Sequence, residues 1–134
     1  MSRQDTDILA RELGKLGGFG AKWAAKRLAT VEYESSLELR GTVQDIARRV
    51  AAVVLPIGRE IPELPVQPEE GKYSLLVGGG TAGLNPAIAH VHIDGSGPLT
   101  RVKVRAAAKE GLVKQKTAEG VVKRIESLLR GHDA

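Results

Sequence analysis

The sequence contains no cysteine, and this absence excludes several kinds of site at once. A chain without thiols forms no disulfide, offers no thiolate ligand to a metal and has no cysteine nucleophile. Long apolar runs are missing too, since none approaches the roughly 20 residues of a membrane-spanning helix. The first residues also lack the charged-then-apolar layout of a secretory signal. We therefore expect a cytoplasmic protein without a transmembrane segment.

Aromatic residues are scarce, with four in 134 residues. Proteins that bind unpaired nucleic acid usually stack bases on aromatic side chains, and none of the four lies within the basic run at residues 101–116. Charge is unevenly divided: residues 31–98 carry five basic and nine acidic side chains, and residues 99–134 carry nine basic and four acidic. Because the acidic stretch can neutralise the basic one inside the fold, we do not expect nucleic acid as the partner.

Residues 1–30 are predicted to form an N-terminal helical segment. Apolar residues at helical spacing predict a helix over residues 4–16, and a second short helix is predicted over residues 21–29. The segment is basic and amphipathic, so it suits docking on its own domain, on a second copy in a homodimer, or on an anionic membrane surface. Docking is expected, because most amphipathic helices cover a core. The predicted contact residues are Phe19, Trp23, Lys22 and Lys26.

Residues 31–134 are predicted to form a single α+β domain. Apolar and polar residues alternate with a period of two in four segments, which predicts half-buried strands at residues 31–39, 72–77, 87–94 and 101–106. Apolar stripes at helical spacing predict helices at residues 43–54, after a capping motif, and at residues 115–130. The four prolines within residues 55–71 predict a stiff, extended connection.

The last two strands are predicted to form a hairpin with a four-residue loop at residues 95–98. In this register His92 lies opposite Arg101. His90 lies opposite Lys103, and both apolar sets share one face.

Opposite charges place the first strand beside the last, because cross-strand pairs of opposite charge are favourable. The predicted fold is therefore a two-layer α+β arrangement. It has an antiparallel sheet of about four strands in the order β-α-β-β-β-α, with amphipathic helices packed on one face and N-terminal helices in addition.

The order of elements resembles a known family. The strand at residues 31–39 leads into the helix at 42–54, and the strand at 101–107 leads into the long helix at 114–129. This succession resembles a reduced helix-grip domain of the START or Bet v 1-like family, which includes polyketide cyclases and lipid-binding proteins. The resemblance covers roughly residues 30–130. It implies a hydrophobic small molecule held between the sheet and the last helix.

Two histidines on one strand are the strongest candidate for a ligand site. His90, His92 and Asp94 share the polar side of their strand, a pattern that can hold a metal. The predicted neighbours Arg101 and Lys103 are positive and oppose a cation, so we assign no metal. A solvated strand face is the simpler interpretation. If the pair has a function, an anion contacted by His90, His92, Arg101 and Lys103 is as plausible as a metal.

Two short motifs receive structural interpretations. Gly78, Gly80 and Gly83 fit a nucleotide-binding spacing, but a strand and not a helix is predicted to follow, which favours a hairpin loop. Arg59 and Pro65 bound a polyproline-type recognition pattern, and here a rigid linker is the better interpretation.

No serine or threonine lies in a recognised nucleophile motif, so we assign no catalytic residue and do not expect an enzyme. The expected function is a non-catalytic domain that binds a hydrophobic small molecule between sheet and helices, without a cofactor. One alternative is a module for protein interaction or homo-oligomerisation. The other is a binder of an anionic partner, either nucleic acid or a membrane surface.

Overall fold

The computed structural model describes residues 3–13, 29–79, 85–95, 98–110 and 116–131. In chain order its elements are an N-terminal helix at residues 3–13, β1 (Ala29–Arg40), α2 (Val43–Val53), β2 (Arg59–Glu60), β3 (Lys72–Gly79), β4 (Asn85–Gly95), β5 (Leu99–Glu110) and α3 (Thr117–Gly131).

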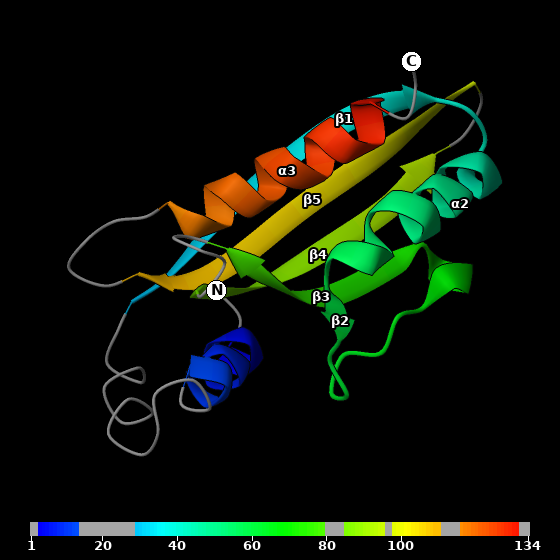
Figure 1. Cartoon of the computed structure of the whole chain (residues 1–134). Coiled ribbons are helices and arrows are strands. Elements are labelled where there is room, and N and C mark those ends of the chain that lie inside the picture. Colours follow the sequence, from blue (N-terminus) through cyan, green and yellow to red (C-terminus); the bar gives the residue numbers. More distant parts are fainter. Residues whose placement is uncertain (1–2, 14–28, 80–84, 96–97, 111–115, 132–134) are drawn as a thin grey trace.

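The strands form one antiparallel sheet in the order β1-β5-β4-β3-β2 (Figure 1). This confirms the predicted α+β class with an antiparallel sheet, and it confirms that the first predicted strand lies beside the last. The sheet has one strand more than the four expected. The additional strand is β2, whose two residues pair with Leu75 and Leu76 at the edge of β3.

The proline-rich connection between α2 and β3 is less extended than predicted. Short 3-10 turns occur at Leu55–Ile57 and Pro68–Glu70, on either side of β2. Pro56 and Pro68 lie at the starts of these turns, where a missing N–H removes no hydrogen bond. The prediction of an extended connection is therefore only partly right.

The hairpin of β4 and β5 has a different register from the one predicted. His92 pairs with Lys103 and not with Arg101. His90 pairs with Arg105. Asp94 pairs with Arg101, where Leu99 was expected, so the pairing is shifted by two residues. Such a shift leaves every side chain on its predicted face, so the alternation of apolar and polar residues does not distinguish the two registers.

One face of the sheet, called here the helix face, is covered by α2 and α3 (Figure 1). α3 lies mainly over β5 and β1, while α2 packs toward β4. Alanines at positions 87, 89, 106 and 108 line this face, and their small side chains let the helices approach closely. The fully buried side chains contributed by the two helices include Ile46, Val50, Val122, Ile125 and Leu129.

α2 begins at the predicted capping box. The backbone N–H of Asp45 donates to Thr42 Oγ1 at 3.1 Å, and the backbone N–H of Thr42 donates to Asp45 Oδ2 at 3.2 Å. These bonds hold the pKa of Asp45 below its ordinary value, because they favour the ionised carboxylate. The cap fixes the point where the chain leaves β1 and turns onto the helix face.

The opposite face of the sheet carries polar side chains from β1, β5, β4 and β3. We call it the polar face and define it by Glu34, Lys72, Ser74, His90, His92, Lys103 and Arg105. The N-terminal helix packs on one end of this face, where a small second core contains Ile8, Leu9, Ile61, Leu76, Ile88 and Ala107. The described part of the N-terminal segment is therefore docked on its own sheet.

Several predicted features lie outside the described residues. They are the second short helix, the contact residues Phe19, Lys22, Trp23 and Lys26, and the glycines at 80 and 83. Among the described helices, none is long and apolar enough to cross a membrane.

Candidate functional site

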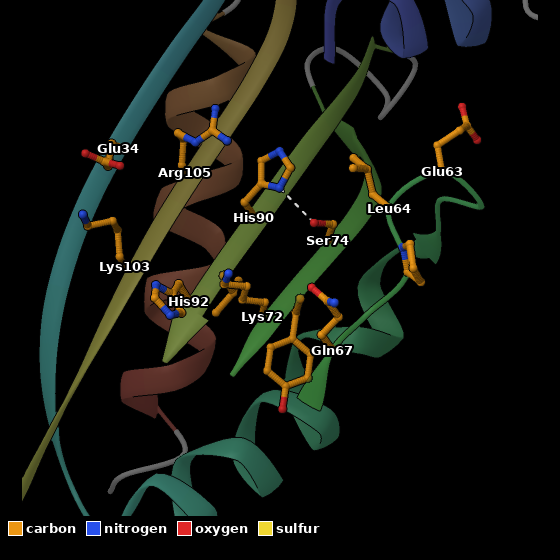
Figure 2. A pocket seen from close by; sticks show the side chains of 13 residues that line it. Glu34, Glu63, Leu64, Gln67, Lys72, Ser74, His90, His92, Lys103 and Arg105 are labelled. Atoms are coloured by element: carbon orange, nitrogen blue, oxygen red, sulfur yellow. Dashed lines mark hydrogen bonds between the residues drawn. The ribbon is translucent and has the colours of Figure 1, made fainter. Parts of the chain in front are cut away.

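A hollow of about 390 Å³ lies on the polar face, beside the N-terminal helix. Its floor consists of side chains from β1, β5, β4 and β3, and one wall is the chain segment after β2 (Figure 2). The register of the sheet arranges the floor in rows that run across the strands. One row contains Glu34, Arg105, His90 and Ser74, and the next contains Ser36, Lys103, His92 and Lys72.

His90 is held from both sides of its ring. Ser74 Oγ lies 2.9 Å from His90 Nδ1, across the pairing of β3 and β4 (Figure 2). Asp5 Oδ2, from the N-terminal helix, lies 3.1 Å from His90 Nε2. The Asp5 residue is 2% exposed, whereas the His90 side chain is 21% exposed. The imidazole is therefore fixed in orientation but still reaches the hollow.

Arg105 compensates the buried carboxylate of Asp5. Its Nη1 lies 3.6 Å from Asp5 Oδ2 and 2.9 Å from Glu32 Oε1. A buried carboxylate without such partners is costly, because burial removes its hydration. The charges of Asp5, Arg105 and Glu32 therefore form a network that joins the N-terminal helix to β5 and β1.

The neighbouring row has an excess of positive charge. Lys103 and Lys72 flank His92 on either side in the register, and all three residues are exposed. Lys72 Nζ lies 3.7 Å from Glu70 Oε2. Within the described part of the chain, Lys103 makes no ion pair shorter than 4 Å. Two ammonium groups beside an imidazole favour a negatively charged occupant.

The wall of the hollow has an apolar part and an acidic part. Leu64 and Pro65 supply the apolar surface, and Glu63 stands at the edge (Figure 2). Arg11 Nη1 donates to Glu63 Oε2 at 2.5 Å, and this bond holds the pKa of Glu63 below its ordinary value. The same hydrogen bond raises the pKa of Arg11. A second ion pair joins Arg59 of β2 to Glu12, so the wall and the strand before it are both tied to the N-terminal helix.

Three of the four predicted ligand residues come together here. His90, His92 and Lys103 all line the hollow. Arg101 lies nearer the start of β5, opposite Asp94, and its Nη2 is 3.6 Å from Glu38 Oε1. The two-residue shift in register moves Arg101 away from the histidines. Arg105 now lies beside His90.

Sequence reasoning missed Asp5, Lys72, Ser74 and Arg105 as members of this site. Three of them have a detectable signal, because Lys72, Ser74 and Arg105 alternate onto the polar side of their predicted strands. Asp5 has no such signal, since it is far away in the sequence and reaches the site only because its helix docks on the sheet. The apolar Leu76, Ile88 and Ala107 on the polar side indicate that something covers that end.

Among the residues that the structure describes, no group of three or more His, Asp or Glu side chains is arranged to hold a metal ion. No family model matches the chain, and no curated protein or solved structure matches it either. The resemblance to helix-grip domains therefore stays a prediction.

Proposed function

We propose that this chain is a binding domain for a small anionic molecule with an apolar part, held in the hollow on the polar face. The observation that carries this proposal is the row of Lys72, His92 and Lys103, which concentrates positive charge beside the apolar wall of Leu64 and Pro65. The anion would meet the ammonium groups, and the apolar part would contact the wall.

The sequence also predicted an apolar ligand between the sheet and α2 and α3. The described side chains of that layer belong to one continuous cluster of buried residues. The hollow, by contrast, is open to solvent and lined by charged side chains such as Lys72, Lys103 and Arg105, which bind anions and neutral molecules differently. This contrast favours the polar face as the ligand site, where three of the four residues predicted to contact an anion, His90, His92 and Lys103, lie together.

The proposal is tested with benzoate, a small carboxylate with an apolar ring, and benzamide, its neutral counterpart. Backbone amide shifts of the labelled protein are followed by NMR during titration with each. Benzoate should shift amides of β3, β4 and β5 around Lys72, His92 and Lys103, and benzamide should bind more weakly. Binding should also weaken as salt is added, because the ammonium groups are exposed.

Lys103→Ala should weaken benzoate binding about 3- to 10-fold, the range expected for one charge-assisted contact at a partly exposed site. Lys123→Ala is the matched control. Lys123 is also exposed, but it lies on α3 and pairs with Glu119 at 3.8 Å. Equal affinities of the two variants would contradict the proposal. Preferential binding of benzamide, with shifts confined to α2 and α3, would instead support the apolar site.

A further inference from the structure

Three side chains beside the cationic row form a hydrogen-bonded chain. Ser74 Oγ contacts one ring nitrogen of His90 at 2.9 Å, and the buried Asp5 carboxylate contacts the other at 3.1 Å. The three residues come from β3, β4 and the N-terminal helix, and they are separated by up to 85 positions in the sequence. A hydroxyl, an imidazole and a carboxylate in this order are the parts of an activated serine nucleophile.

The partners of His90 fix which nitrogen carries the proton. A carboxylate can only accept, so in a neutral imidazole the proton resides on Nε2 and points at Asp5 Oδ2. Nδ1 is then free to accept from the Ser74 hydroxyl. This is the tautomer that a general base needs, and Asp5 selects it.

We propose that Ser74 is a nucleophile, that His90 is its general base and that Asp5 is a positioning residue, so that the protein cleaves small carboxylic esters. Both Ser74 and His90 line the hollow, where a substrate reaches them. The preference for esters that carry a negative charge rests on the anion site of the proposed function. Lys72 lies two residues from Ser74 on the same face of β3, opposite His92. These basic groups favour the oxyanion that forms when the hydroxyl adds to a carbonyl.

The reaction balances without any further reagent. Ser74 Oγ bonds to the carbonyl carbon while its proton passes to His90 Nδ1. The bond from that carbon to the leaving oxygen then breaks, and His90 returns the proton to the leaving alcohol. Water repeats the sequence on the acyl-serine: it adds to the carbonyl carbon, gives its proton to His90, and releases the acid while Ser74 regains its hydrogen. The sum is ester and water giving acid and alcohol.

The first experiment is labelling of the full chain with a fluorophosphonate probe, which phosphonylates activated serines. Mass spectrometry should find one adduct, mapped to Ser74. Ser74→Ala should abolish it, and Ser36→Ala should leave it unchanged. Ser36 is the matched control because it is exposed on the same face, in the row of Lys103. Absence of an adduct, or an adduct that persists in Ser74→Ala, would overturn the proposal.

A second variant separates activation from mere hydrogen bonding. The chain has no cysteine, so Ser74→Cys introduces a unique thiol. If His90 acts as a base, this thiol should react with iodoacetamide at least tenfold faster at pH 6 than the thiol of Ser36→Cys. Adding Asp5→Asn should move the pH profile of alkylation, which a purely structural role would not do. Equal rates and profiles for the two thiols would contradict the proposal.

Esters distinguish failure of the activity from failure of the anion site. 4-Acetoxybenzoate carries a carboxylate, and phenyl acetate is its neutral counterpart. We expect faster turnover of 4-acetoxybenzoate, with the preference reduced in Lys103→Ala. Labelling at Ser74 without a preference for 4-acetoxybenzoate would support the proposed activity and contradict the proposed anion site. Benzoate binding without labelling or turnover would support the proposed binding function and contradict the proposed esterase activity.

Discussion

The two faces of the sheet use the same strands for different purposes. On the helix face, alternate residues of β1, β5, β4 and β3 meet α2 and α3 in a continuous apolar core. On the polar face the composition changes along the strands. The row of Ala107, Ile88 and Leu76 lies in the core under the N-terminal helix. Asp5 binds His90 in the next row, and the row of Lys103, His92 and Lys72 is exposed.

This difference shows why a site belongs on the polar face. The helix face has exchanged nearly all of its solvent contact for packing, so a change there affects stability. The polar face is only half covered, and its border combines buried groups that orient a side chain with exposed groups that meet a ligand. His90 lies at this border, where its ring is anchored by the 2% exposed Asp5 carboxylate and still lines the hollow.

The largest expected effect on the free energy of unfolding comes from removing a buried side chain between α3 and the helix face. Ile125 lies on α3 and is fully buried, so Ile125→Ala should lower the free energy of unfolding by about 3–4 kcal/mol through lost burial and a residual cavity. Lys103→Ala on the polar face should change it by no more than about 0.5 kcal/mol. Urea unfolding followed by circular dichroism measures both. Similar losses for the two variants would contradict the division of roles between the faces.

A smaller effect is expected at the second core. Leu9 is fully buried between the N-terminal helix and the sheet, and Leu9→Ala should cost about 2–3 kcal/mol. The core under this helix is small, so the loss should appear first as local release of residues 3–13. Hydrogen exchange should then accelerate in this helix and in β3 and β4 near His90, while α3 keeps its protection.

Leu64→Ala serves as the control, since Leu64 packs against the same core but is only partly buried. Uniform acceleration of exchange in Leu9→Ala, with α3 affected as strongly as the N-terminal helix, would mean that the two faces unfold together.

The sequence determines some of these features and leaves others open for physical reasons. Alternation with a period of two assigns the strands and their faces, and the Thr42–Asp45 pair marks the start of α2. The same alternation is blind to a shift of two residues, so it could not choose between Arg101 and Lys103 as the partner of His92.

The Ser74–His90–Asp5 chain was beyond sequence reasoning for a different reason. Ser74 and His90 meet through strand pairing, which the correct register for β3 and β4 would have supplied. Asp5 joins them through docking of a helix across the sheet, and no local pattern encodes that contact. The pattern of opposite charges correctly predicted that β1 lies beside β5, but it did not predict the contact of Asp5 with His90.

The smallest expected effect concerns the ion pair that joins the wall of the hollow to the N-terminal helix. The hydrogen bond from Arg11 holds the folded-state pKa of Glu63 below 4.5, its ordinary value. A lowered carboxylate pKa contributes stability that is present above pH 4.5 and is lost as the pH falls through the folded-state pKa. Glu63→Gln should therefore lower the urea midpoint slightly at pH 7, and this difference from the unsubstituted chain should shrink as the pH falls below 4.5.

Glu60→Gln is the matched control for this last comparison, because Glu60 is an exposed carboxylate on β2, three residues away. It removes the same charge without touching the bond to Arg11. If both variants show the same pH dependence, the effect belongs to net charge and not to the ion pair. If only Glu63→Gln shows a pH-dependent change in the urea midpoint, the ion pair between Arg11 and Glu63 joins the wall of the hollow to the N-terminal helix. Acid then breaks this ion pair, because a protonated Glu63 no longer pairs with the Arg11 guanidinium.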